Sequence, residues 1–131
     1  MAQRAPALNS DTSPRISVCI ANYNGERVLG GCLESVLAQT VEASVEILVH
    51  DDASTDASLQ LLRERYPQTV LIASDTNVGF CIANNRMVAQ ARGEFVLLLN
   101  NDAALAPDAL ATLLHEAVRQ QPQGILSLPQ Y

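Results

Sequence analysis

The sequence feature that most constrains the fold is an uninterrupted apolar run over residues 95–99, which leads directly into Asn100, Asn101 and Asp102. Such a run is typical of a central strand in a parallel sheet that is covered on both faces. Sheets of this kind bind ligands just beyond the carboxyl ends of their strands. Asn100 and Asp102 leave the strand on the same side, so we expect their oxygens to converge on one divalent cation. The same triplet also suits an ordinary turn, so it does not decide by itself between a turn and a site.

Strand-like and helix-like segments alternate along the rest of the chain. Apolar and β-branched runs predict strands over residues 16–21, 45–50, 69–73, 95–99 and 124–128. Helical spacing and cap residues predict helices over residues 26–39, from a cap within 54–56 to about 66, over about 81–91, and from 107 onwards. This alternation predicts an α/β fold with a mainly parallel sheet. We assign residues 1–14 to a flexible tail and residues 15–131 to one domain.

Composition excludes several classes of protein. With 131 residues, 48% hydrophobic and 17% charged, the chain is expected to fold as one globular domain. The net charge is −6, and the eight basic residues are all scattered arginines, so nucleic-acid binding is not expected. No apolar stretch approaches the roughly 20 residues that span a bilayer. The three widely spaced cysteines predict buried free thiols in a reducing cytosol.

Polar residues gather at the ends of three predicted strands. Because the carboxyl ends of parallel strands lie along one edge of a sheet, these clusters should be neighbours in the fold. One such cluster could simply consist of the Asn and Asp residues that are common in turns, but three on one edge indicate a binding site. The clusters are Asn22-Tyr23-Asn24, Asp51-Asp52 and Asn100-Asn101-Asp102.

These motifs, taken in order, resemble those of the family 2 inverting glycosyltransferases. They are SVCIANYNG at 17–25, VHDDASTD at 49–56, NVGF at 77–80 followed by NNR at 84–86, and LNND at 99–102. The resemblance covers about residues 16–128 and is greatest to the branch that includes rhamnosyltransferases and related polysaccharide-assembly enzymes. It implies a GT-A fold, a Rossmann-like α/β/α sandwich. The chain would be its N-terminal half, which binds a nucleoside-diphosphate sugar and a divalent cation.

The resemblance also implies roles for residues on the nucleoside side of that site. Ala21 and Tyr23 would line the base pocket, with the ring of Tyr23 stacked on the base. Asp52 would accept a hydrogen bond from a base N–H, and Asp51 would be a neighbouring support.

On the diphosphate side, the resemblance implies that Asp102 binds Mg²⁺ or Mn²⁺, which offsets charge on the leaving group. Asn100 stands where the family usually has Asp, so it would be a second, neutral oxygen ligand. Arg86 would approach a phosphate, although a solvated helix charge is an equally good interpretation. The other residues assigned to the nucleotide sugar are Asn22, Asn77, Gly79 and Asn101.

The catalytic residue stays unassigned, because family members carry the acceptor-binding region and the carboxylate base in a later segment that this sequence lacks. The resemblance implies a UDP-, dTDP- or GDP-sugar donor, a glycan or lipid-linked acceptor bound by that segment, and no transfer by this chain alone. It also implies a cytoplasmic location, or a peripheral one at the inner face of the membrane. Two alternatives remain: a non-catalytic nucleotide-sugar-binding module, and a signalling receiver domain. A receiver would need an acidic pair after the first strand and a lysine after the last, and the sequence has neither.

Overall fold

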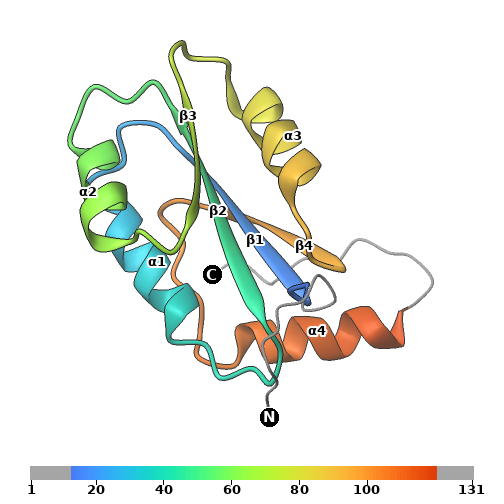
Figure 1. Ribbon diagram of the computed structural model, residues 1–131. Helices are drawn as coiled ribbons and strands as arrows, with labels where there is room; N and C mark the ends of the chain where they lie inside the picture. Colours follow the sequence, from blue (N-terminus) through green and yellow to red (C-terminus); the bar gives the residue numbers. More distant parts are fainter. Residues whose placement is uncertain (1–12, 121–131) are drawn as a thin grey trace.

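The computed structural model describes residues 13–120, which form a four-stranded parallel sheet with helices on both faces (Figure 1). Along the chain the elements are β1 (Ile16–Asn22), α1 (Leu29–Leu37), β2 (Val45–Asp52), α2 (Ser58–Arg65), β3 (Val70–Ser74), α3 (Phe80–Gln90), β4 (Phe95–Asn100) and α4 (Ala109–Arg119). The strand order is β3-β2-β1-β4, and every neighbouring pair is parallel. The predicted α/β fold with a mainly parallel sheet is therefore confirmed. The predicted strand at 124–128 and the first twelve residues lie outside the described residues.

Two apolar clusters cover the two faces of the sheet. The larger cluster joins Val18 and Ile20 of β1 to buried residues of α1, α2 and α4. Cys19 of β1 and Leu48 of β2 point to the other face, where Met87 of α3 packs against them. This division follows from the two-residue period of a strand. Figure 1 shows the same layers, with α3 on the opposite side of the sheet from α1 and α2.

The position of β4 corrects one expectation from the sequence, which placed this strand in the centre of the sheet with both faces covered. Among the described strands, β4 pairs with β1 only and forms one end of the sheet. Leu97 and Leu99 pack on the larger cluster, whereas Val96 and Leu98 are 42% and 51% exposed. The difference arises because α3 packs mainly against β1 and β2. An apolar run predicts a strand, but it does not show which elements cover that strand.

Three helices begin later than predicted. α2 begins at Ser58, and Ala57 rather than a residue of 54–56 is its N-cap. Residue 26 was the expected start of α1, but residues 26–28 form a turn in which the Val28 and Leu29 N–H groups donate to the Gly25 carbonyl. α4 likewise begins at Ala109 rather than at residue 107. None of the helices within residues 13–120 has the length and hydrophobicity that crossing a membrane requires.

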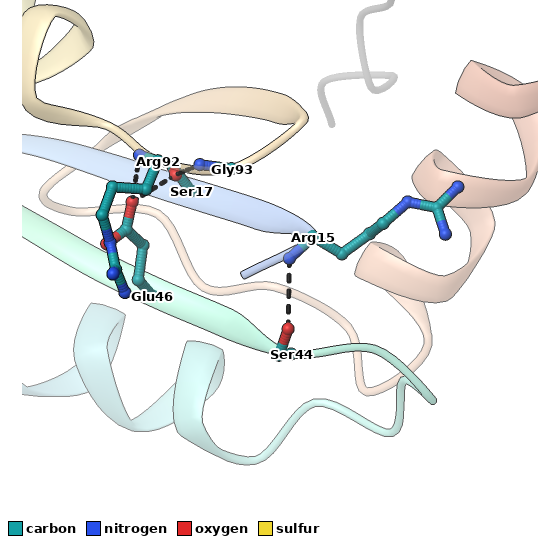
Figure 2. Close-up of polar contacts among 6 residues, drawn as sticks. All are labelled: Arg15, Ser17, Ser44, Glu46, Arg92 and Gly93. Carbon is teal, nitrogen blue, oxygen red and sulfur yellow. Dashed lines mark hydrogen bonds and ion pairs between the residues drawn. The ribbon is translucent and has the colours of Figure 1, made fainter. Parts of the chain in front are cut away.

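A polar cluster holds the amino ends of the strands together (Figure 2). Glu46 of β2 accepts hydrogen bonds from the Ser17 hydroxyl of β1 at 2.6 Å and from the Arg92 N–H at 2.7 Å. The Ser17 hydroxyl in turn accepts from the Gly93 N–H at 2.8 Å. A Cβ at Gly93 would lie 2.6 Å from the Ser17 nitrogen, so glycine is what allows this close approach. The cluster fixes the entry into β4 and lies at the opposite end of the strands from the predicted site.

Candidate functional site

The carboxyl ends of β1, β2 and β4 bring the three polar clusters of the sequence to one edge of the sheet. The strand register pairs Asn22 with Asp51 on one side of β1 and Ala21 with Asn100 on the other. The chain order of the strands reverses at β1, because β2 and β3 lie on one side and β4 on the other. In open α/β sheets, ligands bind at this point of reversal.

Asn22 is the central polar residue of this edge, and its side chain is almost completely buried, at 1% exposure. Its amide nitrogen Nδ2 donates to Asp51 Oδ1 at 3.0 Å, and its oxygen Oδ1 accepts from Asn101 Nδ2 at 2.9 Å. Gly25 packs directly against this pair, because a Cβ at position 25 would collide with both Asn22 Oδ1 and Asn101 Nδ2. The Asn22 amide therefore bonds to Asp51 and to Asn101, and the Asn101 amide nitrogen bonds to Asn22.

Asp51 is fully buried, and its charge is satisfied within the protein. Besides the Asn22 amide, the carboxylate accepts from the Ser54 hydroxyl at 2.7 Å and from the Ser54 N–H at 3.1 Å. A hydrogen bond from a main-chain N–H two or three residues later is typical of aspartate at a turn. Asp51 thus fixes the loop after β2 and the Asn22 amide, and its role beside the nucleoside stays a prediction.

The loops that follow β1 and β2 are tied into one unit by Asn24, a member of the first polar cluster to which the sequence gave no individual role. Asn24 Oδ1 accepts from the Thr55 N–H at 2.7 Å and from the Asp56 N–H at 3.2 Å. Its own N–H donates to the Ser54 hydroxyl at 2.8 Å. Asn24 and Ala53 both have positive φ, at 51° and 62°; asparagine tolerates this conformation, whereas for Ala53 it costs roughly 1–2 kcal/mol. Such strain is commonly found at functional sites.

Asp52 points to the other loop of the site, which leads into α3. Its two carboxylate oxygens accept from the Val78 N–H at 2.7 Å and from the Gly79 N–H at 2.9 Å. Asn77 Nδ2 lies 3.5 Å from the Asp52 carbonyl oxygen. The carboxylate is 6% exposed, and each of its oxygens keeps a lone pair for another donor. Tyr23 is 52% exposed at this edge, while Ala21 is half-buried.

His50 and Arg86 form a contact on the α3 side of the sheet. Arg86 Nη1 lies 3.4 Å from His50 Nε2 and 3.4 Å from the Ser74 hydroxyl. Since arginine can only donate, Nε2 must be the acceptor and Nδ1 must carry the imidazole proton. Burial and the Arg86 charge lower the pKa of His50, and these effects outweigh the opposite influence of Asp52 and Asp51. His50 is therefore neutral at physiological pH, and it is fully buried.

Asn100 and Asp102 are exposed at the carboxyl end of β4. The Asn100 carbonyl accepts from the Ala103 N–H at 3.1 Å, which closes a turn, and it lies 3.4 Å from the Cys32 sulfur. Burial, with a smaller contribution from the Asp102 carboxylate, raises the pKa of Cys32 to about 11. Cys32 thus stays a thiol that donates to Asn100 and is not a nucleophile. Cys19 is also buried, whereas Cys81, which the sequence indicated to be buried as well, is exposed.

Asn100 and Asp102 offer the oxygen ligands that Mg²⁺ and Mn²⁺ prefer. In the described part of the chain, no group of three or more His, Cys, Asp or Glu side chains could hold a metal ion. A cation beside Asp102 would therefore complete its coordination with water and with ligand phosphates, as protein-bound Mg²⁺ commonly does. The donor set fits a cation that is shared with a bound diphosphate.

An open parallel sheet with polar groups beyond the carboxyl ends of its strands is the architecture of nucleotide-binding α/β domains. Two solved structures share this architecture. The mannosyltransferase PcManGT from Pyrobaculum calidifontis, in complex with GDP-Man and Mn²⁺, has a TM-score of 0.73 and 27% identity, over 84% of this chain and 33% of that one. S. aureus TarS 1-349, in complex with UDP-GlcNAc, has a TM-score of 0.70 and 26% identity, over 86% of this chain and 37% of that one. The fold is therefore GT-A.

The sequence profile described as "Glycosyl transferase family 2" matches residues 17–129, and the chain belongs to this family. Chondroitin synthase from Escherichia coli is 36% identical over 105 residues, which are 79% of this chain and 15% of that protein. The succinoglycan biosynthesis protein ExoO from Rhizobium meliloti is 34% identical over 108 residues, which are 82% of this chain and 31% of that protein. The chain thus spans less than a third of the length of each of these relatives. The closer resemblance to the rhamnosyltransferase branch stays a prediction.

Proposed function

We propose that the protein transfers a sugar, with inversion, from a nucleoside-diphosphate donor during polysaccharide or glycoconjugate assembly, and that the described domain binds the donor and a divalent cation. The observation that carries this proposal is the meeting of Asp52, Tyr23, Asn100 and Asp102 at one edge of the sheet. The complexes of its structural relatives with GDP-Man and Mn²⁺ and with UDP-GlcNAc support the choice of ligand. The names of the sequence relatives support the choice of pathway class.

For the nucleoside, we assign the base pocket to Ala21, Tyr23 and Asp52. The exposed ring of Tyr23 is available for stacking on a base, an interaction that is typically worth about 1–3 kcal/mol. The free lone pairs of Asp52 can accept a base N–H while the Val78 and Gly79 N–H groups hold the carboxylate in place.

For the diphosphate, we assign Asp102 and Asn100 to the cation and Arg86 to a phosphate. When bound, Mg²⁺ or Mn²⁺ would offset the charge that develops on the departing nucleoside diphosphate. Asn77 and Gly79 lie in the turn that Asp52 anchors, so they shape the neighbouring wall of the site. His50 and Ser74 hold the guanidinium of Arg86 over the ends of β2 and β3.

Inverting transfer also needs a general base that removes the proton of the acceptor hydroxyl as it attacks the anomeric carbon. Asp51 and Asp52 are held by protein N–H and O–H donors, and Asp102 is assigned to the cation, so we assign no described carboxylate to this role. We accordingly expect the 131-residue chain alone to bind donor without acceptor-dependent transfer. The same observation favours the second candidate, a nucleotide-sugar-binding module without catalysis.

Calorimetric titration of the 131-residue chain tests the binding part of this proposal. UDP, dTDP and GDP would be titrated with Mn²⁺, with Mg²⁺ and with EDTA. We expect one nucleotide to bind more tightly with a cation than in EDTA. At 100 times its dissociation constant it should stabilise the fold by about 2.7 kcal/mol. Equal affinity in EDTA would refute the metal role, and no binding by any nucleotide would refute the donor site.

Incubation of the full-length protein with its donor tests the catalytic part. Release of nucleoside diphosphate that depends on an acceptor, with an NMR-detected inverted anomeric configuration, would support the enzyme. Donor binding with no transfer to any acceptor would favour the module. Acceptor-dependent transfer by the 131-residue chain itself, at about 1 s⁻¹ or faster, would show that one of the carboxylates assigned to binding is the base.

A further inference from the structure

We propose that Asn101 is a positioning residue, whose hydrogen bond to Asn22 sets the turn that carries Asn100 and Asp102 against the nucleoside side of the site. The pair thereby makes cation and nucleotide binding cooperative. This inference rests on the proposed function, which assigns Asn100 and Asp102 to the cation. It gives Asn101 a role different from the direct ligand contact that the sequence suggested.

The orientation of the turn provides the first support. Asn100 and Asp102 are exposed, whereas Asn101 between them is half-buried and turns its amide toward Asn22. The hydrogen bond from the Ala103 N–H to the Asn100 carbonyl closes the turn around this inward side chain. One anchored residue thus stands between the two residues assigned to the cation, so its position limits theirs.

The direction of the hydrogen bonds provides the second support. The Asp51 carboxylate can only accept, so Asn22 must present its Nδ2 to Asp51 and its Oδ1 to residue 101. The Ser54 N–H and hydroxyl hold Asp51 in place. If the Asn22 amide flipped, its oxygen would face this carboxylate and the hydrogen bond from Nδ2 would be lost. Residue 101 must therefore supply a donor, and Asn101 Nδ2 supplies it at 2.9 Å. The chain of bonds from Ser54 to Asn101 joins the loop after β2 to the turn after β4.

The packing around this pair provides the third support. Gly25 is buried, and its backbone lies so close to Asn22 Oδ1 and Asn101 Nδ2 that a Cβ would collide with both atoms. The hydrogen bond is thus enclosed by the loop after β1, so water has little access to replace a lost partner. An anchored turn also lowers the ordering cost when a cation and a diphosphate bind together.

Two substitutions at position 101 distinguish positioning from direct ligation. Asn101→Ala removes the donor. Asn101→Asp replaces it with a carboxylate that faces Asn22 Oδ1, and the turn should move away. If Asn101 instead ligated the cation directly, Asn101→Asp would strengthen cation binding, because it adds a charged oxygen ligand. The two roles thus predict opposite signs for the same variant.

The experiment measures the dissociation constant of the tightest of UDP, dTDP and GDP by calorimetry, in Mn²⁺ and in EDTA, for the 131-residue chain and each variant. The ratio of the EDTA constant to the Mn²⁺ constant is the metal enhancement. We expect both variants to lower this enhancement by about fivefold or more, which corresponds to about 1 kcal/mol, and to bind in EDTA within about twofold of the original chain. Gln68→Ala, an exposed amide at the amino end of β3, is the matched control and should change neither value.

Each other outcome has a distinct meaning. An unchanged enhancement in both variants, or a higher one in Asn101→Asp, would overturn the positioning role while leaving the proposed function intact. If the enhancement stayed unchanged because binding weakened equally in EDTA and in Mn²⁺, Asn101 would act on the nucleotide itself. If the original chain showed no metal enhancement, the proposed metal role would fail first, and this inference would fail with it. Urea unfolding of each variant confirms that the comparison is made between folded proteins.

Discussion

Replacement of Asp52 by alanine should reduce both the folding stability and the nucleotide affinity of this domain, for separable reasons. In the folded chain the carboxylate accepts the Val78 N–H at 2.7 Å and the Gly79 N–H at 2.9 Å, immediately before α3. Alanine leaves both donors without this partner at a position that is 6% exposed. A buried donor without an acceptor costs about 1–3 kcal/mol, and partial access of water to the end of the helix reduces that cost. We therefore expect a loss of about 2–4 kcal/mol in the free energy of unfolding.

The effect of Asp52→Ala on nucleotide binding should be independent of metal, because the base N–H lies at the other end of the ligand from the cation. Loss of a hydrogen bond to a charged acceptor is worth about 1.5–3 kcal/mol, or roughly 10- to 150-fold in the dissociation constant. This factor should be the same in Mn²⁺ and in EDTA. Titration at a temperature where urea curves show the variant to be folded separates weaker binding from unfolding.

Asp75→Ala is the matched control, because Asp75 is exposed, and within the described residues no hydrogen bond or ion pair involves its side chain. It should change stability by no more than about 0.5 kcal/mol. Unchanged stability of Asp52→Ala would refute the role of the carboxylate at the start of α3. Reduced stability with normal nucleotide affinity would refute the base contact alone. A loss of affinity seen only in Mn²⁺ would move Asp52 to the metal end of the site.

Two further predictions concern stability. His50 has a pKa below its ordinary value of 6.5, so below that pH the unfolded chain binds more protons than the folded one, and the free energy of unfolding should fall as the pH drops. Urea titrations between pH 7 and 5 should show this slope in the original chain and in His115→Gln, but not in His50→Gln, and a slope retained in His50→Gln would contradict the assignment. Gly79→Ala should destabilise the fold by about 1 kcal/mol or more, because φ is 90° there. The new Cβ would meet no neighbour, so the whole effect would come from the backbone conformation. Gly31→Ala in α1, which also meets no neighbour, should instead stabilise it by about 0.5–1 kcal/mol, and equal effects in urea unfolding would refute the conformational explanation.

The fold was largely predictable because its signals are local. The two periodicities, 2 for strands and 3.6 for helices, identify the described strands and helices of an alternating α/β fold from windows of a few residues. The edge position of β4 was not predictable, because it depends on where α3 packs and not on the composition of residues 95–99. A run of five apolar residues predicts a strand equally well whether helices cover one face of that strand or both.

The gathering of the three polar clusters at one edge was also predictable, since parallel strands present their carboxyl ends together, but the direction of each side chain was not. Asn22 and Tyr23 are adjacent in the sequence, yet the first is 1% and the second 52% exposed. The partners that bury Asn22 lie 29 and 79 residues away, at Asp51 and Asn101, so no local pattern shows them. One signal was available: Ser54, three residues after Asp51, has the spacing of an aspartate turn.

The structure divides the predicted site residues into two kinds, and the division explains how their substitutions should differ. The polar atoms of Asn22 and Asp51 are enclosed and paired with protein donors and acceptors. A buried polar network that is fully paired is rigid, whereas one with a missing member is costly, so changes here should lower stability together with binding. Tyr23, Asn100 and Asp102 are exposed, so their loss should weaken ligand binding in a protein that remains folded. The enclosed residues thus form the support on which the exposed ones are presented, which is the arrangement that precise positioning of a ligand requires.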